Sequence, residues 1–422
     1  MSSVAYSDAL RGHEGPVCPR RTVTPPNRLE TTTRELLLSL ASARHGNSLE
    51  ILRGVLRSRT EQTLVLLAPS CRSAIAQILS LLPQREVVMP AFTCPVVKTA
   101  VEVAGKRIVY VDCAPGSLNA TSAEFAKEAR PGRILLPTHL FGLPTDIERI
   151  CALAKERQCV TIEDVAAAFG ARRGGRVLGT FGDFGVLSFE KSKRLPAFRG
   201  AAILVNNDRV LNPAALDTHR LVSTTGSMPL RELLRSVLHN VATVPWLYGR
   251  LTVHKILASH RRRPADEAET AAAARASVFY RREFHPYQAE LVLRALRRWD
   301  ATREHVAGLV AVYRGIFEGS DVRTFVDIGC DDGALLRFPI VFPGLDRREI
   351  LRRALSRGLY LETNYERPLP EPADWEAYPN AAWAARSMLL LPLYRRLPLC
   401  AAQHIAEQVL AISREARRDV AA

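Results

Sequence analysis

The feature that most constrains this chain is an alternation of short apolar runs with helix-like stretches between residues 63 and 207. Strands that are apolar along nearly their whole length are typical of a parallel sheet whose two faces are both covered by helices. The apolar runs are residues 63–70, 85–90, 106–112, 133–140, 159–164, 185–190 and 201–207. The pattern therefore predicts an α/β fold with a mostly parallel sheet sandwiched between helices.

Helical periodicity occupies the segments between several of these runs. Residues 72–82 place their apolar side chains on one helical face, and residues 144–158 have the same spacing. Thr145 and Asp146 stand at the start of the second segment, where short polar side chains cap a helix. Both segments are predicted to be helices that cover the sheet.

Changes of pattern along the chain predict four regions. They are a flexible N-terminal arm (1–30), a large domain (31–215), a basic amphipathic helical insertion with a linker (216–276), and a connecting helix with a small C-terminal α/β domain (277–422). In the last region we expect one long helix from about 286 through 316, strands at 335–342, 358–362 and 388–393, and helices at 346–358 and 401–412.

Composition excludes several classes of protein. The 47% hydrophobic content is that of a globular chain, and no uninterrupted apolar stretch is long enough to span a membrane. The eight cysteines form no CxxC pair, which indicates reduced thiols rather than a disulfide framework or a zinc site, so we expect no bound metal. The charged N-terminus does not have the apolar core of an export signal, and we expect a cytoplasmic protein.

The net charge of +15 is concentrated in part in residues 228–264. Leucines recur there at helical spacing, with Arg231 and Arg235 on the opposite side. Three interpretations stay open: a covering or dimer-interface helix, a helix on an acidic membrane surface, and a nucleic-acid site. Nucleic-acid binding is the least favoured, because aromatic residues are not interleaved with the basic ones.

Three strand ends carry unusual polar residues. Asp164 ends one apolar run, a second run leads through Ser188 to Lys193, and Cys71-Arg72-Ser73 opens a helix directly after the first strand. The carboxyl ends of parallel strands share one edge of a sheet, and the N-terminus of a helix binds phosphate. A phosphate seat, a carboxylate and a lysine on one rim are what pyridoxal phosphate (PLP) requires.

With these residues in place, the chain resembles the DegT/DnrJ/EryC1/StrS family of PLP-dependent sugar aminotransferases of fold type I. The similarity is strong over 60–210 and looser over 280–415. It is carried by PAFTCP (90–95), GKRIVYVD (105–112), LLPTHLFGLPTD (135–146), IEDVAAAFGA (162–171), GTFGDFGVLSFEKSK (179–193) and FRGAAILVNND (198–208). Weaker blocks follow at 286–300, 358–365 and 389–398.

The resemblance assigns a role to individual residues. Lys193 would form the Schiff base with PLP, with Lys191, two residues earlier, as the alternative. Asp164 would pair with the pyridinium nitrogen, and Ser188 would bind the phosphate. Ser73 belongs to the helix start that is expected to hold the phosphate.

Several positions depart from the family pattern. Cys71-Arg72 replaces Gly-Thr at the phosphate helix, and Cys94 stands where an aromatic residue would stack on the cofactor, a role that Phe92 is a candidate to take over. Ala167 replaces a Gln that would contact the ring hydroxyl. We therefore expect a divergent member whose site includes Cys71, Arg72, Cys94 and Ala167.

The resemblance also implies a homodimer in which a partner residue, at Arg281 or Arg282 in this numbering, contacts the phosphate. The implied reaction moves an amino group from a donor, glutamate by resemblance, to a keto group on a nucleotide-linked sugar, as in polysaccharide or antibiotic biosynthesis. One alternative is other PLP chemistry such as dehydration, although the dehydrases similar to this family carry His where this chain has Lys193. The other is an inactive regulatory or scaffold homologue.

Two further signals are weaker. Residues 326–334 are similar to the first motif of S-adenosylmethionine methyltransferases, but Asp331 replaces the central Gly and fewer than 100 residues follow, so we interpret them as a turn. His139 lies at a strand end near the expected site, and we interpret it as a structural, hydrogen-bonded histidine.

Overall fold

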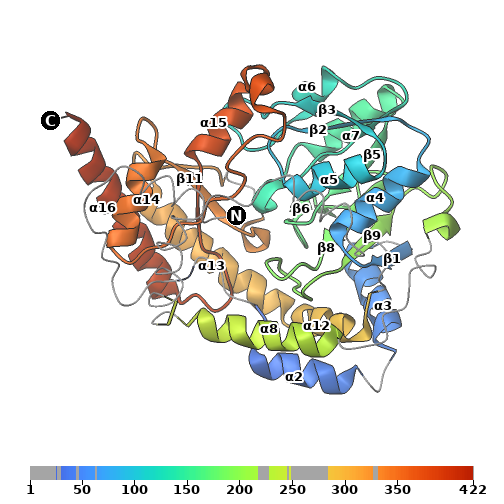
Figure 1. Cartoon of the computed structure of the whole chain (residues 1–422), viewed down its shortest axis with the longest axis horizontal. Helices are drawn as coiled ribbons and strands as arrows, with labels where there is room; N and C mark the ends of the chain where they lie inside the picture. The colour runs from blue at the N-terminus through green and yellow to red at the C-terminus, as the bar shows by residue number, and fades with distance from the viewer. Residues whose placement is uncertain are drawn as a thin grey trace.

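The computed structural model describes residues 25, 30–43, 47–61, 64–216, 228–244, 247–248, 284–326 and 331–421 (Figure 1). Most of the predicted arm, the second half of the basic segment 228–264, and both Arg281 and Arg282 lie outside these ranges. Among the residues described, no helix has both the length and the apolar character needed to cross a bilayer.

A seven-stranded sheet forms the centre of the N-terminal half, in the order β1-β9-β8-β5-β4-β2-β3. Its strands are β1 (Leu64–Ala68), β2 (Glu86–Pro90), β3 (Arg107–Val111), β4 (Arg133–Leu135), β5 (Val160–Asp164), β8 (Phe184–Ser188) and β9 (Ala201–Val205). Strand β9 pairs antiparallel with both β1 and β8, and every other neighbouring pair is parallel. The predicted mostly parallel sheet is confirmed.

Helices cover both faces of this sheet, because alternate side chains of each strand point to opposite faces. Along β9, Ala201 and Ile203 pack into one hydrophobic cluster, and Ala202 and Leu204 pack into another. The helices of this half are α2 (Thr33–Ser42), α3 (Ser48–Thr60), α4 (Cys71–Leu81), α5 (Pro95–Val103), α6 (Ser122–Ala126), α7 (Ile147–Glu156), α8 (Met228–Ala242) and α12 (Pro286–Arg297). Helices α4 and α5 cover one face, and α3 and α12 cover the other beside β1 and β9.

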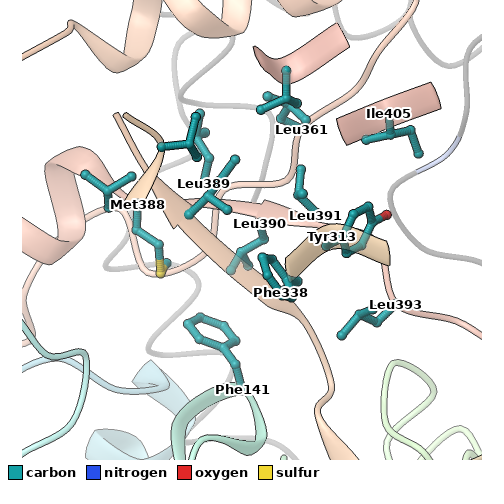
Figure 2. Close-up of a cluster of buried hydrophobic side chains, with 14 of the residues drawn as sticks. Phe141, Tyr313, Phe338, Leu361, Met388, Leu389, Leu390, Leu391, Leu393 and Ile405 are labelled. Carbon is teal, nitrogen blue, oxygen red and sulfur yellow. The ribbon is translucent and has the colours of Figure 1, made fainter. Parts of the chain in front are cut away.

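A smaller antiparallel sheet organises the C-terminal half, in the order β10-β11-β12. Its strands are β10 (Arg323–Thr324), β11 (Phe338–Val341) and β12 (Leu389–Leu391). Helices α13 (Trp299–Phe317), α14 (Arg347–Ser356), α15 (Pro379–Ser387) and α16 (Leu399–Ala421) surround it. Figure 2 shows the shared core, in which Phe141 from the N-terminal half lies close to Phe338 and Leu390 of this sheet.

The structure corrects several details of the predicted elements. The single helix expected over 286–316 is wrong: it is divided into α12 and α13 at Arg298, which has non-helical backbone angles. Residues 358–362 do not form the predicted strand: Leu359 and Glu362 are isolated bridge residues, and Glu362 pairs with Leu390. Asp146 occupies the predicted cap position of α7, but its carboxylate accepts hydrogen bonds from the backbone and hydroxyl of Ser122 at 2.9 and 2.6 Å.

Short helices and a minor hairpin complete the described structure. They are β6 (Arg172–Arg173), β7 (Arg176–Val177), η1 (Leu140–Gly142), η2 (Pro213–Leu216), η6 (Asp332–Ala334) and η7 (Pro372–Ala377). Because η6 forms one tight turn between α13 and β11, the interpretation of residues 326–334 as a turn is confirmed for the described residues 331–334.

Candidate active site

The polar residues predicted from the strand ends share one rim of the large sheet. Asp164 is the last residue of β5, Ser188 is the last of β8, and Cys71 opens α4 three residues after the end of β1. Their strands are parallel to one another, so these ends face the same edge. The rim is therefore where a ligand would bind in this class of sheet.

Asp164 is almost fully buried and is held in place by hydrogen bonds. Its carboxylate accepts the backbone N–H of Ala166 at 2.9 Å and the hydroxyl of Thr138. Burial raises the pKa of Asp164, and these two bonds, together with Lys193 and His139, oppose that rise. A buried carboxylate with this environment is set to receive a cation, since a positive partner would offset its desolvation.

Lys193 lies in the loop between β8 and β9, and its ammonium interacts electrostatically with Asp164, Cys71 and Cys94. Its backbone N–H donates to Glu190 O at 2.9 Å, which closes a turn directly after β8. Lys191, in contrast, is exposed. The geometry therefore favours Lys193 over Lys191 as the lysine of this site.

The start of α4, where the phosphate seat is predicted, is closed by a capping box. Ser70 and Ser73 form a reciprocal capping box, in which the Ser73 N–H donates to Ser70 Oγ at 3.1 Å and the Ser70 N–H donates to Ser73 Oγ at 3.0 Å. The Ser73 hydroxyl also donates to Ser70 O at 2.8 Å. Arg72, between them, has a buried Nε with no hydrogen-bond partner in the part of the chain that the structure describes. Such a group is costly unless an acceptor reaches it.

Tyr365 closes the site from the C-terminal half, and sequence reasoning did not single it out. Its hydroxyl hydrogen-bonds to the Cys94 thiol, and its ring stacks on Phe141 with centroids 5.6 Å apart. Tyr365 has a φ of 55° and Phe141 a φ of 58°, so both residues adopt the left-handed backbone conformation, which residues other than glycine rarely adopt. The block 358–365 was noticed as a motif, but only the fold brings Tyr365 to Cys94.

Phe92, the predicted substitute for the stacking aromatic, packs beside Tyr365. Its side chain is buried, and its ring meets that of Tyr365 edge-on at 5.9 Å. Burial raises the pKa of both Cys71 and Cys94, so both thiols are neutral at physiological pH. Tyr365 therefore brings an aromatic ring to Cys94, and the stacking role of Phe92 stays a prediction.

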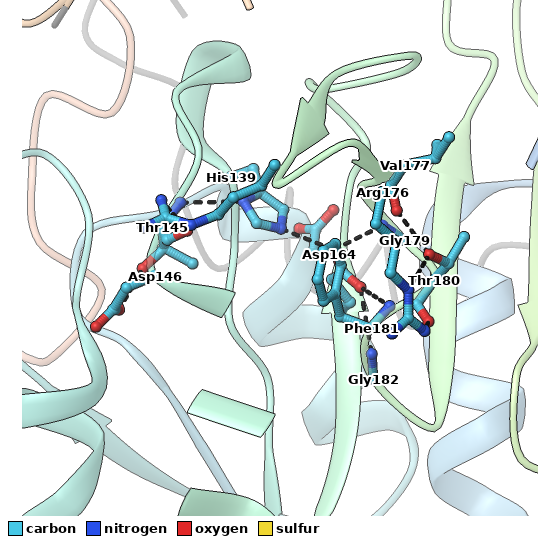
Figure 3. A network of polar contacts seen from close by, with 12 residues as sticks. His139, Thr145, Asp146, Asp164, Arg176, Val177, Gly179, Thr180, Phe181 and Gly182 are labelled. Atoms are coloured by element: carbon cyan, nitrogen blue, oxygen red, sulfur yellow. Dashed lines mark hydrogen bonds and ion pairs between the residues drawn. The ribbon is translucent and has the colours of Figure 1, made fainter. Parts of the chain in front are cut away.

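A buried network supports the floor of the rim (Figure 3). Glu163, next to Asp164, accepts hydrogen bonds from His139 Nε2 at 3.0 Å and from the backbone N–H of Gly179 at 2.6 Å. Its second oxygen accepts the N–H groups of Phe181 at 3.0 Å and Gly182 at 3.3 Å. The interpretation of His139 as a structural histidine is confirmed.

Ser188, Ala167 and Arg281 were also predicted to belong to the site, and their contacts do not test that role. Ser188 is buried at the end of β8, where its hydroxyl accepts the Glu190 N–H at 3.4 Å. Ala167 lies in the turn after β5, with its carbonyl oxygen close to Gly142. Arg281 lies outside the described residues. Ser188 and Ala167 therefore adjoin the rim, but their expected roles stay predictions.

Comparison with known proteins agrees with this geometry. Residues 37–232 match the sequence profile of the DegT/DnrJ/EryC1/StrS aminotransferase family. This match covers a little under half of the chain. Among solved structures, Spr1654 from Streptococcus pneumoniae in its PLP form has a TM-score of 0.72 at 18% identity, covering 93% of this chain and 99% of that chain. The chain thus shares the fold of this solved structure over nearly its whole length.

Curated relatives of the family match over a shorter stretch. A UDP-N-acetyl-3-dehydro-alpha-D-glucosamine 3-aminotransferase from Acidithiobacillus ferrooxidans is 37% identical over 130 residues, which cover 31% of this chain and 35% of that protein. A pleiotropic regulatory protein from Geobacillus stearothermophilus is 32% identical over 148 residues, covering 35% of this chain and 39% of that protein. The chain therefore matches less than half the length of each of these two relatives.

Proposed function

We propose that this protein is a PLP-dependent aminotransferase that transfers an amino group, with glutamate as donor, to a keto group on a nucleotide-linked sugar. The observation that carries the proposal is the meeting of Lys193 and Asp164 on one rim, with the phosphate seat of α4 beside them. The family match and the aminotransferase among the curated relatives support the same reaction class.

The residues of the rim fit PLP. The buried Arg72 Nε and the start of α4 offer hydrogen-bond donors to a phosphate. Because Arg72 Nε has no partner among the described residues, a bound anion would satisfy it. Asp164 would hold the pyridine nitrogen in its protonated form, and Lys193 Nζ would bind the aldehyde carbon. When bound, PLP supplies an electron sink that stabilises a carbanion on the substrate.

The protein side of the reaction follows from these positions. Once a substrate has displaced Lys193 from PLP, the free amine of Lys193 would move a proton at the substrate carbon. Its position next to Asp164 and both thiols would keep it at the site for this transfer. The Thr138 hydroxyl and the Ala166 N–H keep the Asp164 carboxylate oriented. Tyr365 and Phe141 would exclude water on the side of the C-terminal half.

The decisive experiment is a covalent trap. Purified protein mixed with PLP should give the visible band of a lysine-linked pyridoxal near ~420 nm. Borohydride reduction followed by peptide mass spectrometry should place the pyridoxyl group on Lys193. Lys193→Ala should abolish the band, and Lys191→Ala is the matched control that should retain it. Absence of any band, or a label on Lys191, contradicts the proposal.

The donor and the acceptor need a second test. Adding glutamate to the PLP-loaded protein should bleach the visible band, and adding a nucleotide-linked keto sugar should restore it. A band that no amino donor bleaches would favour other PLP chemistry, such as dehydration.

A regulatory role is the second candidate function. Two observations favour it: one curated relative bears the name of a pleiotropic regulatory protein, and Cys94 and Ala167 replace two polar or aromatic contacts that the family pattern expects. A regulatory homologue would give no Lys193-linked band, so the covalent trap separates the two candidates.

We further propose a homodimer in the cytoplasm, with Arg281 of each subunit reaching the phosphate of the other. Light scattering on the full chain should give twice the 46.7 kDa chain mass. Arg281→Ala should weaken PLP binding without changing this mass, because the arginine would contact the ligand rather than build the interface. A monomer contradicts the proposal.

Contact of residues 228–264 with a membrane surface is also proposed. Helix α8 packs against α2, with Leu233 buried in the cluster that contains Leu36, and the Asn240 amide donates to Thr31 O just before α2. Leu234 and Leu238 of α8 are nevertheless 61% and 59% exposed. Exposed leucines in a segment rich in arginine suit an acidic lipid surface. Leu234→Ser/Leu238→Ser should abolish sedimentation with phosphatidylglycerol vesicles, and wild-type protein that stays in the supernatant contradicts this contact.

A further inference from the structure

Arg194, the residue directly after Lys193, has its side chain buried in the C-terminal half of the molecule. Its guanidinium is 2% exposed and forms an ion pair with Glu30 Oε1 at 3.1 Å. It also donates to two backbone carbonyls, Leu393 O at 3.1 Å and Leu335 O. A guanidinium can bind three acceptors in fixed directions, which an ammonium on a flexible stem does less well.

The two carbonyls belong to the segments that flank the C-terminal sheet. Leu335 precedes β11 and Leu393 follows β12, so Arg194 fastens the lysine loop to both neighbouring strands at once. The same segment before β11 also contacts the other side of the rim, because the Leu336 N–H donates to Phe141 O at 2.8 Å. Residues 335–336 therefore support both the Lys193 loop and the Phe141 turn.

Glu30 is the counter-ion of Arg194 and connects it to the N-terminal segment. Its carboxylate also accepts the backbone N–H of Arg395 at 3.3 Å, and its carbonyl oxygen accepts from Arg298 at 3.2 Å and from Arg395 at 3.0 Å. Burial lowers the pKa of Arg194 to about 10, and Glu30 opposes that shift. The guanidinium is therefore charged at neutral pH.

Further hydrogen bonds join the lysine loop to the N-terminal half. The Ala197 N–H donates to Phe189 O at 2.8 Å, and the Gln288 amide donates to the carbonyls of Ala197 and Arg199 at 3.1 and 2.9 Å. Arg194, next to Lys193 in the chain, hydrogen-bonds to the segments on both sides of the C-terminal sheet.

We propose that Arg194 is a positioning residue for Lys193, which it holds by attaching the lysine loop to the C-terminal sheet with Glu30 as its counter-ion. The inference rests on the proposed function. Lys193 must keep its amine between Asp164 and the two thiols while its own backbone lies in an irregular loop. Loss of the Arg194 contacts would let that loop shift, and the Lys193 amine would move away from the Asp164 carboxylate.

The test measures the state of Lys193 rather than catalysis. The absorption spectrum of the PLP-loaded protein is titrated with pH, and the rate of the covalent link between Lys193 and PLP is followed at the visible band. Arg194→Met and Glu30→Gln should each slow formation of the link about tenfold and shift the pH midpoint of the band, because the amine loses its fixed neighbours. Arg194→Lys should restore part of both.

Matched variants separate positioning from stability. Glu35→Gln removes the partner of Arg298 in the same cluster and leaves the contacts of Arg194 intact, so it should lower stability without changing the rate or the midpoint. The double variant Glu30→Gln/Arg194→Met removes both buried charges and should regain stability relative to the single variants, yet keep the slow link.

Two results overturn the inference in different ways. If the wild-type protein shows no Lys193-dependent band, the proposed function fails and the inference fails with it. If the wild-type band forms and the Arg194 and Glu30 variants have the wild-type rate and midpoint, or if Glu35→Gln shifts them equally, the proposed function stands and Arg194 has only a structural role.

Discussion

The Thr145 N–H donates to His139 Nδ1 at 3.1 Å, and this contact determines the tautomer of a fully buried imidazole. Because Nδ1 is the acceptor, Nε2 carries the proton that His139 shares with Glu163 at 3.0 Å. Four donors thus converge on the two Glu163 oxygens directly behind Asp164. These hydrogen bonds to Glu163 fix the end of β5, where Asp164 is the next residue.

Glu163→Gln should destabilise the protein by about 3 kcal/mol, because one acceptor becomes an NH2 group that faces buried donors. Urea unfolding of the cofactor-free protein measures the loss. Glu148→Gln is the control, since Glu148 and Arg173 form an exposed ion pair at 3.2 Å whose loss should cost less than ~1 kcal/mol. Equal losses for the two variants would contradict the network.

Asp164→Asn should make the cofactor-free protein more stable at pH 7. Burial raises the pKa of Asp164 above its ordinary value of 3.8, so the folded protein binds the proton more tightly than the unfolded chain does. Wild-type stability therefore falls as the pH rises from about 3.8 through the raised pKa, and the variant lacks this slope. Urea unfolding between pH 4 and 7 checks it, and a gap that widens towards pH 4 would refute it.

Gly142→Ala should cost about 2–4 kcal/mol and loosen the rim. Gly142 has a φ of 92°, and an added Cβ would lie 2.8 Å from Leu335 Cα and 2.9 Å from Ala334 O, both backbone atoms that cannot move aside. Gly54 in α3 is the matched control: nothing lies within 4 Å of its Cβ position, so Gly54→Ala should stabilise the helix by about 0.5–1 kcal/mol. Thermal unfolding distinguishes the two signs.

Alkylation should label Cys400 first among the described cysteines. Cys400 is exposed, whereas burial raises the pKa of Cys71 and Cys94 and keeps their thiols unreactive. Quantitative mass spectrometry after brief iodoacetamide treatment should show at least ~10-fold less label on Cys71 and Cys94. Labelling in urea is the control and should equalise the sites. Rapid labelling of Cys94 in the folded protein would argue against its bond to Tyr365.

Local pattern predicted the strands and their polar ends because both are encoded in short stretches. Asp164, Lys193 and Cys71 each follow an apolar run, and the rule that parallel strands end on one edge brings them together. The direction of β9 was not predictable in this way, because an apolar run reads the same for either direction. The end of α12 at Arg298 was missed because helical periodicity continues across it.

Residues whose role depends on distant partners could not be found from spacing. Arg194 is one basic residue in a basic chain until the fold places Glu30 and two carbonyls around it. Tyr365 becomes part of the rim only through its contacts with Cys94 and Phe141. In both cases a buried polar group marks the position, and burial is a property of the tertiary structure.

The antiparallel course of β9 brings both ends of the Lys193 loop to the same edge of the sheet. The chain leaves the rim at Ser188 and returns to the same rim at Ala201, and the Phe189 N–H closes the base of this excursion on Gly200 O at 2.8 Å. Lys193 therefore lies on a loop whose two ends are fixed by the pairing of β8 with β9. The strand pairings fix where this loop begins and ends, so its course between Phe189 and Gly200 depends on contacts made by the loop itself, such as those of Arg194 with Leu335 O and Leu393 O.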